Sequence, residues 1–266
     1  MIQGKANTSK ERKKFALTIA GSDSSSGAGV QADLKTFFKL KVPVVSVITA
    51  ITAQNSKGVF SIHPVPPKEI KKQLKALEED FEIIGAKIGM VPDNQSIKVI
   101  SDFFKRRRDI FFLLDPVLIS TSGSKLYLED TKNSLKEKLI PICNLITPNL
   151  DEAKTLIDFN SEDNLEIAKR FYNKFNVPIL LKGGHSKGLV IEDIFFDGKE
   201  IKKYRWKKLK GEFHGTGCIL SSAIVAYIAL GLSLKEAIGC ALKFLHKQLD
   251  NNFFISKSAL KYLLFK

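Results

Sequence analysis

A glycine-rich turn at residues 214–218, with the sequence His-Gly-Thr-Gly-Cys, precedes a strongly apolar stretch that we expect to be a helix. Gly215 and Gly217 allow backbone conformations that other residues resist, so successive N–H groups can converge on one point. The first amides of a helix lack intrahelical partners and lie at the positive end of its dipole. We therefore predict an anion-binding turn, with Cys218 at a helix start where the pKa of a thiol tends to fall. This pattern suits transfer of a phosphate or carboxylate, although a plain turn with a packed cysteine explains it too.

Three charged residues directly follow predicted buried strands, where ligands of parallel α/β sheets bind. Asp115 ends an apolar strand and Glu152 lies three residues after Asn149. The two carboxylates could hold Mg²⁺, which needs few carboxylates when phosphates supply other ligands. Lys182 leaves a strand into a double glycine and could meet a phosphate. Each residue also has a simpler explanation: an Asp-Pro turn, a capping box between Asn149 and Glu152, and a solvated loop charge.

The loop after the first predicted strand carries Gly27, Gly29 and Ala32 at the spacing of a loose dinucleotide-binding fingerprint. The match is weak, because the loop is longer than a tight turn and the second strand ends without a carboxylate for a ribose. The sequence also lacks the G-x-x-x-x-G-K-[ST] pattern of a P-loop. We favour a loop that binds a small molecule, with Asp23 as a hydrogen-bond acceptor or an ordinary turn residue.

The chain has 266 residues and a net charge of +14, because 42 Lys and Arg outnumber 28 Asp and Glu. Such a charge could attract anionic substrates or nucleic acid, but no zinc-finger or RNA-binding motif accompanies it, which disfavours nucleic acid. The three cysteines lack paired spacing, and no apolar stretch is long enough to cross a bilayer. We expect a soluble cytoplasmic protein that binds no membrane, with a mobile basic tail at residues 1–14.

Apolar strands alternate with amphipathic helices along the rest of the chain. The predicted strands are 15–20, 43–52, 59–65, 83–88, 110–114, 145–147, 177–181, 189–196 and 200–206. The predicted helices are 27–40, 68–81, 94–107, 126–140, 150–157, 164–175, 218–230, 234–249 and 256–265. Continuous apolar strands between helices indicate a mainly parallel sheet covered on both faces. We predict one three-layer α/β/α domain over residues 15–266, with a hairpin at Asp197-Gly198.

Taken together, these motifs resemble the ribokinase-like superfamily and, within it, the hydroxymethylpyrimidine/phosphomethylpyrimidine kinases of thiamine biosynthesis. The similarity runs from about Phe15 to Leu249 and rests on the order and spacing of short motifs. These motifs are residues 20–23, 27–36, 47–50, 53–55, 87–90, 115–117, 146–153, 182–185 and 214–218. The resemblance implies a homodimeric kinase that uses ATP and Mg²⁺. It would phosphorylate the hydroxymethyl group of 4-amino-5-hydroxymethyl-2-methylpyrimidine and then the resulting monophosphate.

The same resemblance assigns roles to individual residues. The substrate pocket would be lined by Gly21, Asp23, Gln54, Met90 and Val117, with Gln54 at the aminopyrimidine edge. ATP would be bound by Asn149, Glu152, Lys182 and Thr216, and the metal by Asp115 and Glu152. The catalytic residues would be Gly215, Gly217, Lys182 and Cys218. The glycine turn would stabilise the moving phosphoryl group, Lys182 would offset phosphate charge, and Cys218 would accept or orient the hydroxyl proton.

Four residues depart from the family pattern. Ser24 and Ser26 stand where relatives usually have Pro and Gly, Thr121 where some carry Lys, and Ile219 where Thr is common. They cluster at the predicted substrate loop and phosphate turn, which leaves two alternatives open. One is a pyridoxine or pyridoxal kinase, whose substrate ring also carries a hydroxymethyl group. The other is a non-catalytic nucleotide- or pyrimidine-binding protein, against which the joint presence of the predicted catalytic and metal residues argues.

Overall fold

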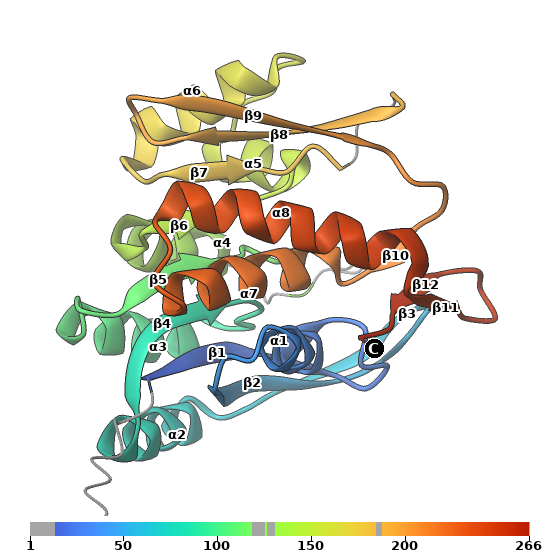
Figure 1. Ribbon diagram of the computed structural model, residues 1–266. Helices are drawn as coiled ribbons and strands as arrows, with labels where there is room; N and C mark the ends of the chain where they lie inside the picture. Colours follow the sequence, from blue (N-terminus) through green and yellow to red (C-terminus); the bar gives the residue numbers. More distant parts are fainter. Residues whose placement is uncertain (1–13, 119–125, 127–130, 185–187, 266) are drawn as a thin grey trace, which may run out of the picture.

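The computed structural model describes residues 14–118, 126, 131–184 and 188–265. Within them, nine strands form one sheet in the order β3-β2-β1-β4-β5-β6-β7-β8-β9 (Figure 1). The strands are β1 Lys14–Asp23, β2 Val44–Asn55, β3 Gly58–Pro64, β4 Glu82–Ile88, β5 Phe111–Leu114, β6 Leu145–Ile146, β7 Ile179–Leu181, β8 Val190–Phe196 and β9 Ile201–Lys207. Neighbours from β2 to β7 pair in parallel, whereas β3, β8 and β9 pair antiparallel at the two edges.

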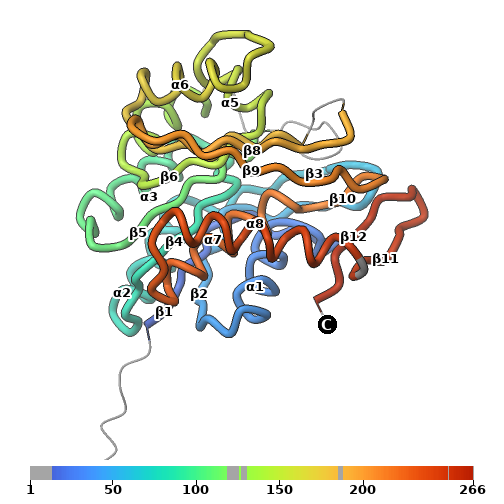
Figure 2. Tube along the Cα trace, turned by 45° about the horizontal axis from the view of Figure 1, so that its top comes forward, coloured from blue at the N-terminus to red at the C-terminus, as the bar shows by residue number. Residues whose placement is uncertain are grey.

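Helices cover both faces of this sheet, which confirms the predicted three-layer α/β/α architecture (Figures 1 and 2). One face carries α2 Pro67–Asp80, α3 Asn94–Arg106, α4 Thr131–Ser134, the short helices η1 Leu135–Leu139 and η2 Ile140–Ile142, α5 Leu150–Ile157 and α6 Asn164–Phe175. The other face carries α1 Gly29–Lys39, α7 Thr216–Ala229 and α8 Leu234–Asn251. No helix in the described part of the chain is long and apolar enough to cross a membrane.

The strands are continuously apolar because both of their faces are buried. In β5, Phe112 and Leu114 join the core beneath α3, whereas Leu113 joins the core beneath α7. Successive side chains of a strand point to opposite faces, so a strand between two helical layers needs apolar residues at every position. Because β1, β2 and β4 to β7 run parallel, their carboxyl ends meet at one edge of the sheet.

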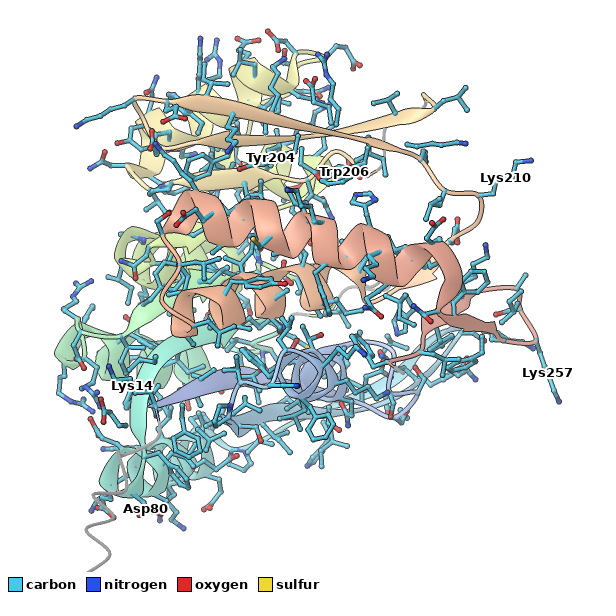
Figure 3. The ribbon with its side chains drawn as sticks, viewed as in Figure 1. Lys14, Asp80, Tyr204, Trp206, Lys210 and Lys257 are labelled. Atoms are coloured by element: carbon cyan, nitrogen blue, oxygen red, sulfur yellow. The ribbon has the colours of Figure 1, made fainter. Side chains whose placement is uncertain are left out.

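At the far edge, β9 is joined to α8 by aromatic side chains. Tyr204 and Trp206 point from β9 toward α8 (Figure 3). The Trp206 ring stacks on His246 of α8, with ring centroids 4.2 Å apart. Burial lowers the pKa of His246 to about 4, so this histidine is neutral at pH 7 and serves packing.

Most predicted elements are confirmed, but the C-terminal one is wrong. Residues 256–265 do not form a helix; they contain β12 Lys261–Leu263, which pairs with β11 Phe253–Ile255 and with β10 Phe213–His214. A short apolar run fits the period of a helix as well as that of a strand, so pairing with distant strands determines the structure of this segment. The predicted polar loop after β1 begins later than expected, because β1 continues to Asp23. The predicted tail lies outside the described residues except Lys14, which begins β1. The helix predicted at 126–140 is wrong at Leu126, which is described and not helical, and its described helical part begins at Thr131.

Candidate active site

Asp23, at the end of β1, organises the loop that leads into α1. Its Oδ1 accepts hydrogen bonds from the Ser25 amide at 2.7 Å and the Ser25 hydroxyl at 2.8 Å. Its Oδ2 accepts from the amides of Gly27 at 3.1 Å and Ala28 at 2.8 Å. These amides precede α1, whose first N–H groups need acceptors. The carboxylate therefore holds the loop closed at the helix start.

Two further contacts tie this loop to distant parts of the chain. The Nε2 of His214, on β10, lies 3.0 Å from the Oδ2 of Asp23. The Ser24 hydroxyl accepts from the Gln54 amide at 2.9 Å and donates to the Gln54 carbonyl at 2.8 Å. Burial opposes ionisation of Asp23, but hydrogen bonds from His214, Ser25 and Gln54 outweigh it and hold its pKa well below the usual range. One of the departures from the family pattern, Ser24, thus fastens the loop to the end of β2.

A pocket opens beside this loop at the carboxyl ends of β1, β2 and β4. Its lining residues are Ala20, Gly21, Ser22, Asp23, Ala28, Gly29, Thr52, Gln54, Lys87, Met90, Val117, Leu126 and Cys218. All five residues predicted for the substrate are among them, together with Cys218. Met90, Val117 and Leu126 belong to one small apolar cluster, which gives the pocket an apolar wall. Sequence analysis missed Lys87 as a lining residue.

The glycine turn lies where chain segments approach closely. Gly215 is the N-cap of α7 and has φ +74°, and a Cβ there would lie 1.9 Å from the carbonyl oxygen of Gly27. A Cβ on Gly217 would lie 3.0 Å from the Nζ of Lys182 and 3.7 Å from Oδ2 of Asp115. Gly215 therefore requires glycine, whereas a Cβ on Gly217 would crowd the end of the Lys182 side chain. The turn joins the pocket loop on one side to the ends of β5 and β7 on the other.

Cys218 lies in the first turn of α7, as predicted, but the prediction of a low thiol pKa is wrong. The thiol is buried, and this burial raises the pKa of Cys218 to about 11. Lys87 and the Gly29 amide, which donates to the sulfur, lower the pKa, whereas Asp33 and Asp115 raise it further. The helix start does not offset the loss of water and the two nearby carboxylates.

Asp115 and Lys182 form an ion pair, with Oδ1 and Nζ 2.9 Å apart. The hydroxyls of Thr147 and Ser221 each donate to Asp115 at 3.2 Å. Burial favours the neutral forms, but mutual attraction outweighs it: the pKa of Asp115 lies below its usual value and that of Lys182 above. Lys182 keeps 16% of its side chain exposed, so its ammonium is reachable from solvent.

Glu152 and Asn149 form the capping box that begins α5. The Glu152 amide donates to Oδ1 of Asn149, and the Asn149 amide donates to Oε2 of Glu152, both at 2.8 Å. Burial raises the pKa of Glu152 to about 7. The charge of Lys182 lowers this pKa, whereas the charge of Asp115 raises it further. The described residues contain no group of three or more His, Cys, Asp or Glu side chains that could hold a metal. A metal here would have at most the two carboxylates of Asp115 and Glu152 and would need oxygens of phosphate or water, a donor set that suits Mg²⁺.

The segment that carries Lys182 is fixed by a residue that sequence analysis missed. Oδ1 of Asp193, on β8, accepts the Gly183 amide at 2.8 Å. The Lys182 amide donates to the Pro148 carbonyl at 2.9 Å, which joins this segment to the start of α5. The available signal was an acid directly before the apolar end of β8, where Asp193 is buried and the neighbouring Glu192 is not. His185, which follows in the same motif, lies outside the described residues.

Comparison with known sequences agrees with this geometry. The sequence model of the phosphomethylpyrimidine kinase family matches residues 23–262. The hydroxymethylpyrimidine/phosphomethylpyrimidine kinase of Aquifex aeolicus is 40% identical over 242 residues, which cover 90% of this chain and 95% of that protein. The enzyme of the same name from Rhizobium meliloti is 41% identical over 239 residues, which cover 87% of this chain and 89% of that protein.

Solved structures give the same fold. The phosphomethylpyrimidine kinase of Clostridium difficile superposes with a TM-score of 0.79 at 38% identity, covering 90% of this chain and 100% of that chain. Pyridoxal kinase of Bacillus subtilis, solved as an ADP complex, superposes with a TM-score of 0.85 at 28% identity, covering 94% of this chain and 96% of that chain. The fold is therefore ribokinase-like, and the chain belongs to the phosphomethylpyrimidine kinase family.

Proposed function

We propose that this chain transfers phosphate from ATP to 4-amino-5-hydroxymethyl-2-methylpyrimidine and then to its monophosphate, in thiamine diphosphate biosynthesis. The observation that carries this proposal is the place of Cys218 between two sites. On one side lies the pocket that also holds Gln54 and Met90. On the other, Gly217 lies against the Asp115–Lys182 pair. An acceptor in the pocket and phosphates at the pair would meet at the glycine turn.

In the pocket, the Gln54 side chain would bind the polar edge of the pyrimidine, and Met90 and Val117 would contact the faces of the ring. Gly21 leaves room for the ring, because a Cβ there would lie 3.0 Å from the Sδ of Met90. Asp23 contributes by fixing the loop, since its oxygens are occupied by backbone amides and His214.

In the first transfer, the Cys218 thiolate, which is the minor form at pH 7, would take the proton of the substrate hydroxyl while the hydroxyl oxygen attacks the γ-phosphorus and ADP leaves. The amides of residues 215–218 would stabilise the moving phosphoryl group, and the Lys182 ammonium would offset its charge. In the second transfer the nucleophile is a phosphate oxygen, which is largely ionised at pH 7. That step needs less from a general base.

Asn149, Glu152 and Thr216 would bind ATP beside Lys182. Asp115 and Glu152 would hold Mg²⁺, because they are the two carboxylates that interact with Lys182 and with each other. When bound, the metal offsets the negative charge of the ATP phosphates. We also expect a homodimer. We expect the protein in a reducing cytoplasm, and the free cysteines among the described residues agree with that compartment.

Pyridoxal kinase activity is the alternative hypothesis, because one pyridoxal kinase superposes with a higher TM-score than the Clostridium difficile enzyme, although at lower identity. An ADP-release assay across the pyrimidine, its monophosphate and the B6 vitamers separates the two. We expect turnover of both pyrimidines and poorer turnover of pyridoxal. A kcat/KM on pyridoxal that equals or exceeds that on the pyrimidine would overturn the proposal, and ADP release with none of them would indicate a binding protein.

The variant Gln54→Ala adds a test of the pocket. A pyrimidine edge without its partner should weaken substrate binding by roughly 1–3 kcal/mol. The KM for ATP should not change, since Gln54 lies in the pocket and away from the Asp115–Lys182 pair.

A further inference from the structure

A second lysine–aspartate pair lies beneath the pocket and takes no part in the steps above. The Nζ of Lys87, on β4, lies 2.9 Å from both carboxylate oxygens of Asp33, on α1, and both side chains are fully buried. Asp33 also accepts from Oγ1 of Thr18 at 2.6 Å and Oγ of Ser222 at 2.8 Å. Burial raises the pKa of Asp33, and the charge of Lys87 and these hydrogen bonds oppose that rise. The two side chains form a buried ion pair. Burial lowers the pKa of Lys87, but the charge of Asp33 outweighs burial and raises it.

This pair is in contact with the pocket and with the helix that carries the thiol. Lys87 and Cys218 line the same pocket. A Cβ on Gly89 would lie 2.8 Å from the Nζ of Lys87, so glycine at this position gives the ammonium its space. Ser222 lies one turn after Cys218 on α7, and α1 packs beside α7 on the same face of the sheet (Figures 1 and 2). The lysine, its aspartate and the thiol are thus held in one rigid arrangement.

Four charged groups act on the Cys218 thiol, each from a different element. Lys87 comes from β4, Asp33 from α1, Asp115 from the end of β5 and Lys182 from the end of β7. The two carboxylates oppose a thiolate. Lys182 is engaged with Asp115 at 2.9 Å and would be drawn to ATP. Lys87 lines the same pocket as the thiol and favours the thiolate, and it acts against the burial that raises the pKa of Cys218 to about 11.

We propose that the Lys87 ammonium, held in place by Asp33, stabilises the Cys218 thiolate that receives the proton of the substrate hydroxyl. The identity of that hydroxyl rests on the proposed function. In the step, the O–H bond breaks and its proton goes to sulfur, while the oxygen forms a bond to the γ-phosphorus. The bond from the γ-phosphorus to the bridging oxygen breaks, and its electron pair leaves with ADP. Lys87 acts through Cys218 and is a positioning residue.

The physical cost of the pair supports a role beyond folding. Two charges that leave water lose more than their attraction returns unless further hydrogen bonds support them, and apolar residues of similar volume are often as stabilising. Here four donor contacts from β1, β4 and α7 converge on Asp33 to keep the charged pair beside the pocket.

Alkylation of Cys218 by iodoacetamide, followed by mass spectrometry of its peptide from pH 7 to 10, tests the proposal without turnover. The thiolate is the reacting form, so the rate follows its population. The first variant is Lys87→Met. The second is the double variant Asp33→Asn/Lys87→Met, which removes both charges and tests the proposal if the single variant does not fold. Ser222→Ala is the matched control, because it removes a hydrogen bond from Asp33 and keeps the ammonium. Alkylation of Cys240 in the same sample, a half-buried cysteine, normalises the rates.

We expect both Lys87 variants to lower the Cys218 alkylation rate about tenfold or more at each pH, the size expected when a close charge is lost. The double variant should act in the same direction, because Lys87 lines the pocket beside Cys218, whereas Asp33 is not among the lining residues. Ser222→Ala should keep the wild-type rate. An unchanged rate in a folded Lys87 variant would overturn the proposal. Because no substrate is present, that result would leave the proposed kinase activity intact, whereas failure of the ADP-release assay would not affect this measurement.

Discussion

Two lysine–aspartate pairs flank Cys218, and they differ in what surrounds them. In both, Nζ lies 2.9 Å from a carboxylate oxygen. The Lys87–Asp33 pair is fully enclosed and hydroxyls of two elements complete it. The Lys182–Asp115 pair lies at the ends of β5 and β7, and its lysine reaches solvent.

The difference shows how burial gives two similar ion pairs different roles. The enclosed pair is held by four donor contacts and keeps its partners, so its expected role is to set the electrostatic field in which a neighbouring group reacts. An accessible pair can exchange partners, so in the proposed reaction Lys182 would leave Asp115 for a phosphate and Asp115 would become free to hold Mg²⁺. Cys218 lies between the fixed pair and the exchangeable one.

The largest expected effect comes from removing the thiol on which both pairs act. Cys218→Ala keeps the backbone amides of the glycine turn, so ATP and pyrimidine should still bind. Loss of the general base should lower kcat on the free pyrimidine by roughly 10²–10⁴-fold. The monophosphate should lose less, because its phosphate oxygen carries no proton to remove. Equal and near-normal kcat values on the two substrates would show that the thiol serves packing alone.

The comparison itself is tested by breaking each pair in turn. Lys87→Met leaves the Asp33 carboxylate uncompensated in the core and should lower the free energy of unfolding by roughly 3–5 kcal/mol. Lys182→Met should cost clearly less stability, because Asp115 keeps the favourable charge of Lys87 and lies where Lys182 reaches solvent, whereas Asp33 is fully enclosed. Its main effect should be on catalysis, with kcat lower by roughly 10²–10³-fold, as for a lost charge-stabilising donor.

Urea unfolding and steady-state kinetics of the same variants separate these effects. Lys203→Met is the control, because it removes a lysine whose ion pair with Glu192 lies at the surface. It should change neither quantity appreciably. Equal losses of stability in Lys87→Met and Lys182→Met would remove the distinction between the pairs.

A smaller effect concerns pH and the accessible pair. Burial raises the pKa of Glu152 to about 7, above the usual value of about 4.3, so the folded protein holds a proton there that the unfolded chain releases between these values. Stability from this group is greatest at low pH and falls as pH rises through 7. Mg²⁺ needs the ionised form, so its half-saturating concentration should rise roughly tenfold from pH 8 to pH 6.

The variant Glu152→Gln shows whether this pH dependence belongs to Glu152. Gln keeps the capping box, so the fold should persist. Titration of ATP itself occurs in both proteins and cancels in the comparison. Asp115 stays ionised over this range, since its pKa lies below the usual value. A Mg²⁺ requirement that changes with pH equally in both proteins would mean that Glu152 only caps α5.

The sequence predicts the fold and the residues that gather at one edge of the sheet, because both follow from short-range patterns. Periodicity defines the strands and helices of the large sheet, and polar residues at strand ends meet at one edge. Gln54 and Met90 were assigned to the pocket through the family resemblance, and both line it. The small sheet of β10, β11 and β12 escapes such patterns, since each strand has two or three residues and its partners are distant in the chain.

What the sequence does not predict is the energetic state of each group. The thiol of Cys218 lies at a helix start, as predicted, yet burial and two carboxylates reverse the expected shift of its pKa. Lys87 stands inside an apolar strand and Asp33 inside a helix, and nothing local pairs them over 54 positions of sequence. Such effects depend on three-dimensional enclosure, which a one-dimensional pattern does not contain.

The smallest expected effect lies in the loop that leads to Asp33 and the enclosed pair. Ser26 has φ +60° there, a conformation that costs about 1–2 kcal/mol for a residue with a Cβ. Ser26→Gly removes that strain but adds flexibility to the unfolded chain, worth roughly 0.5–1 kcal/mol. The free energy of unfolding should therefore rise by about 0.5–1 kcal/mol, measured by urea unfolding.

Lys41→Gly is the matched control, since Lys41 has φ +58° and lies outside the pocket. Both variants should gain stability, whereas only Ser26→Gly should change the KM for the pyrimidine, because its loop borders the pocket; equal KM values in both would show that the loop conformation does not affect substrate binding.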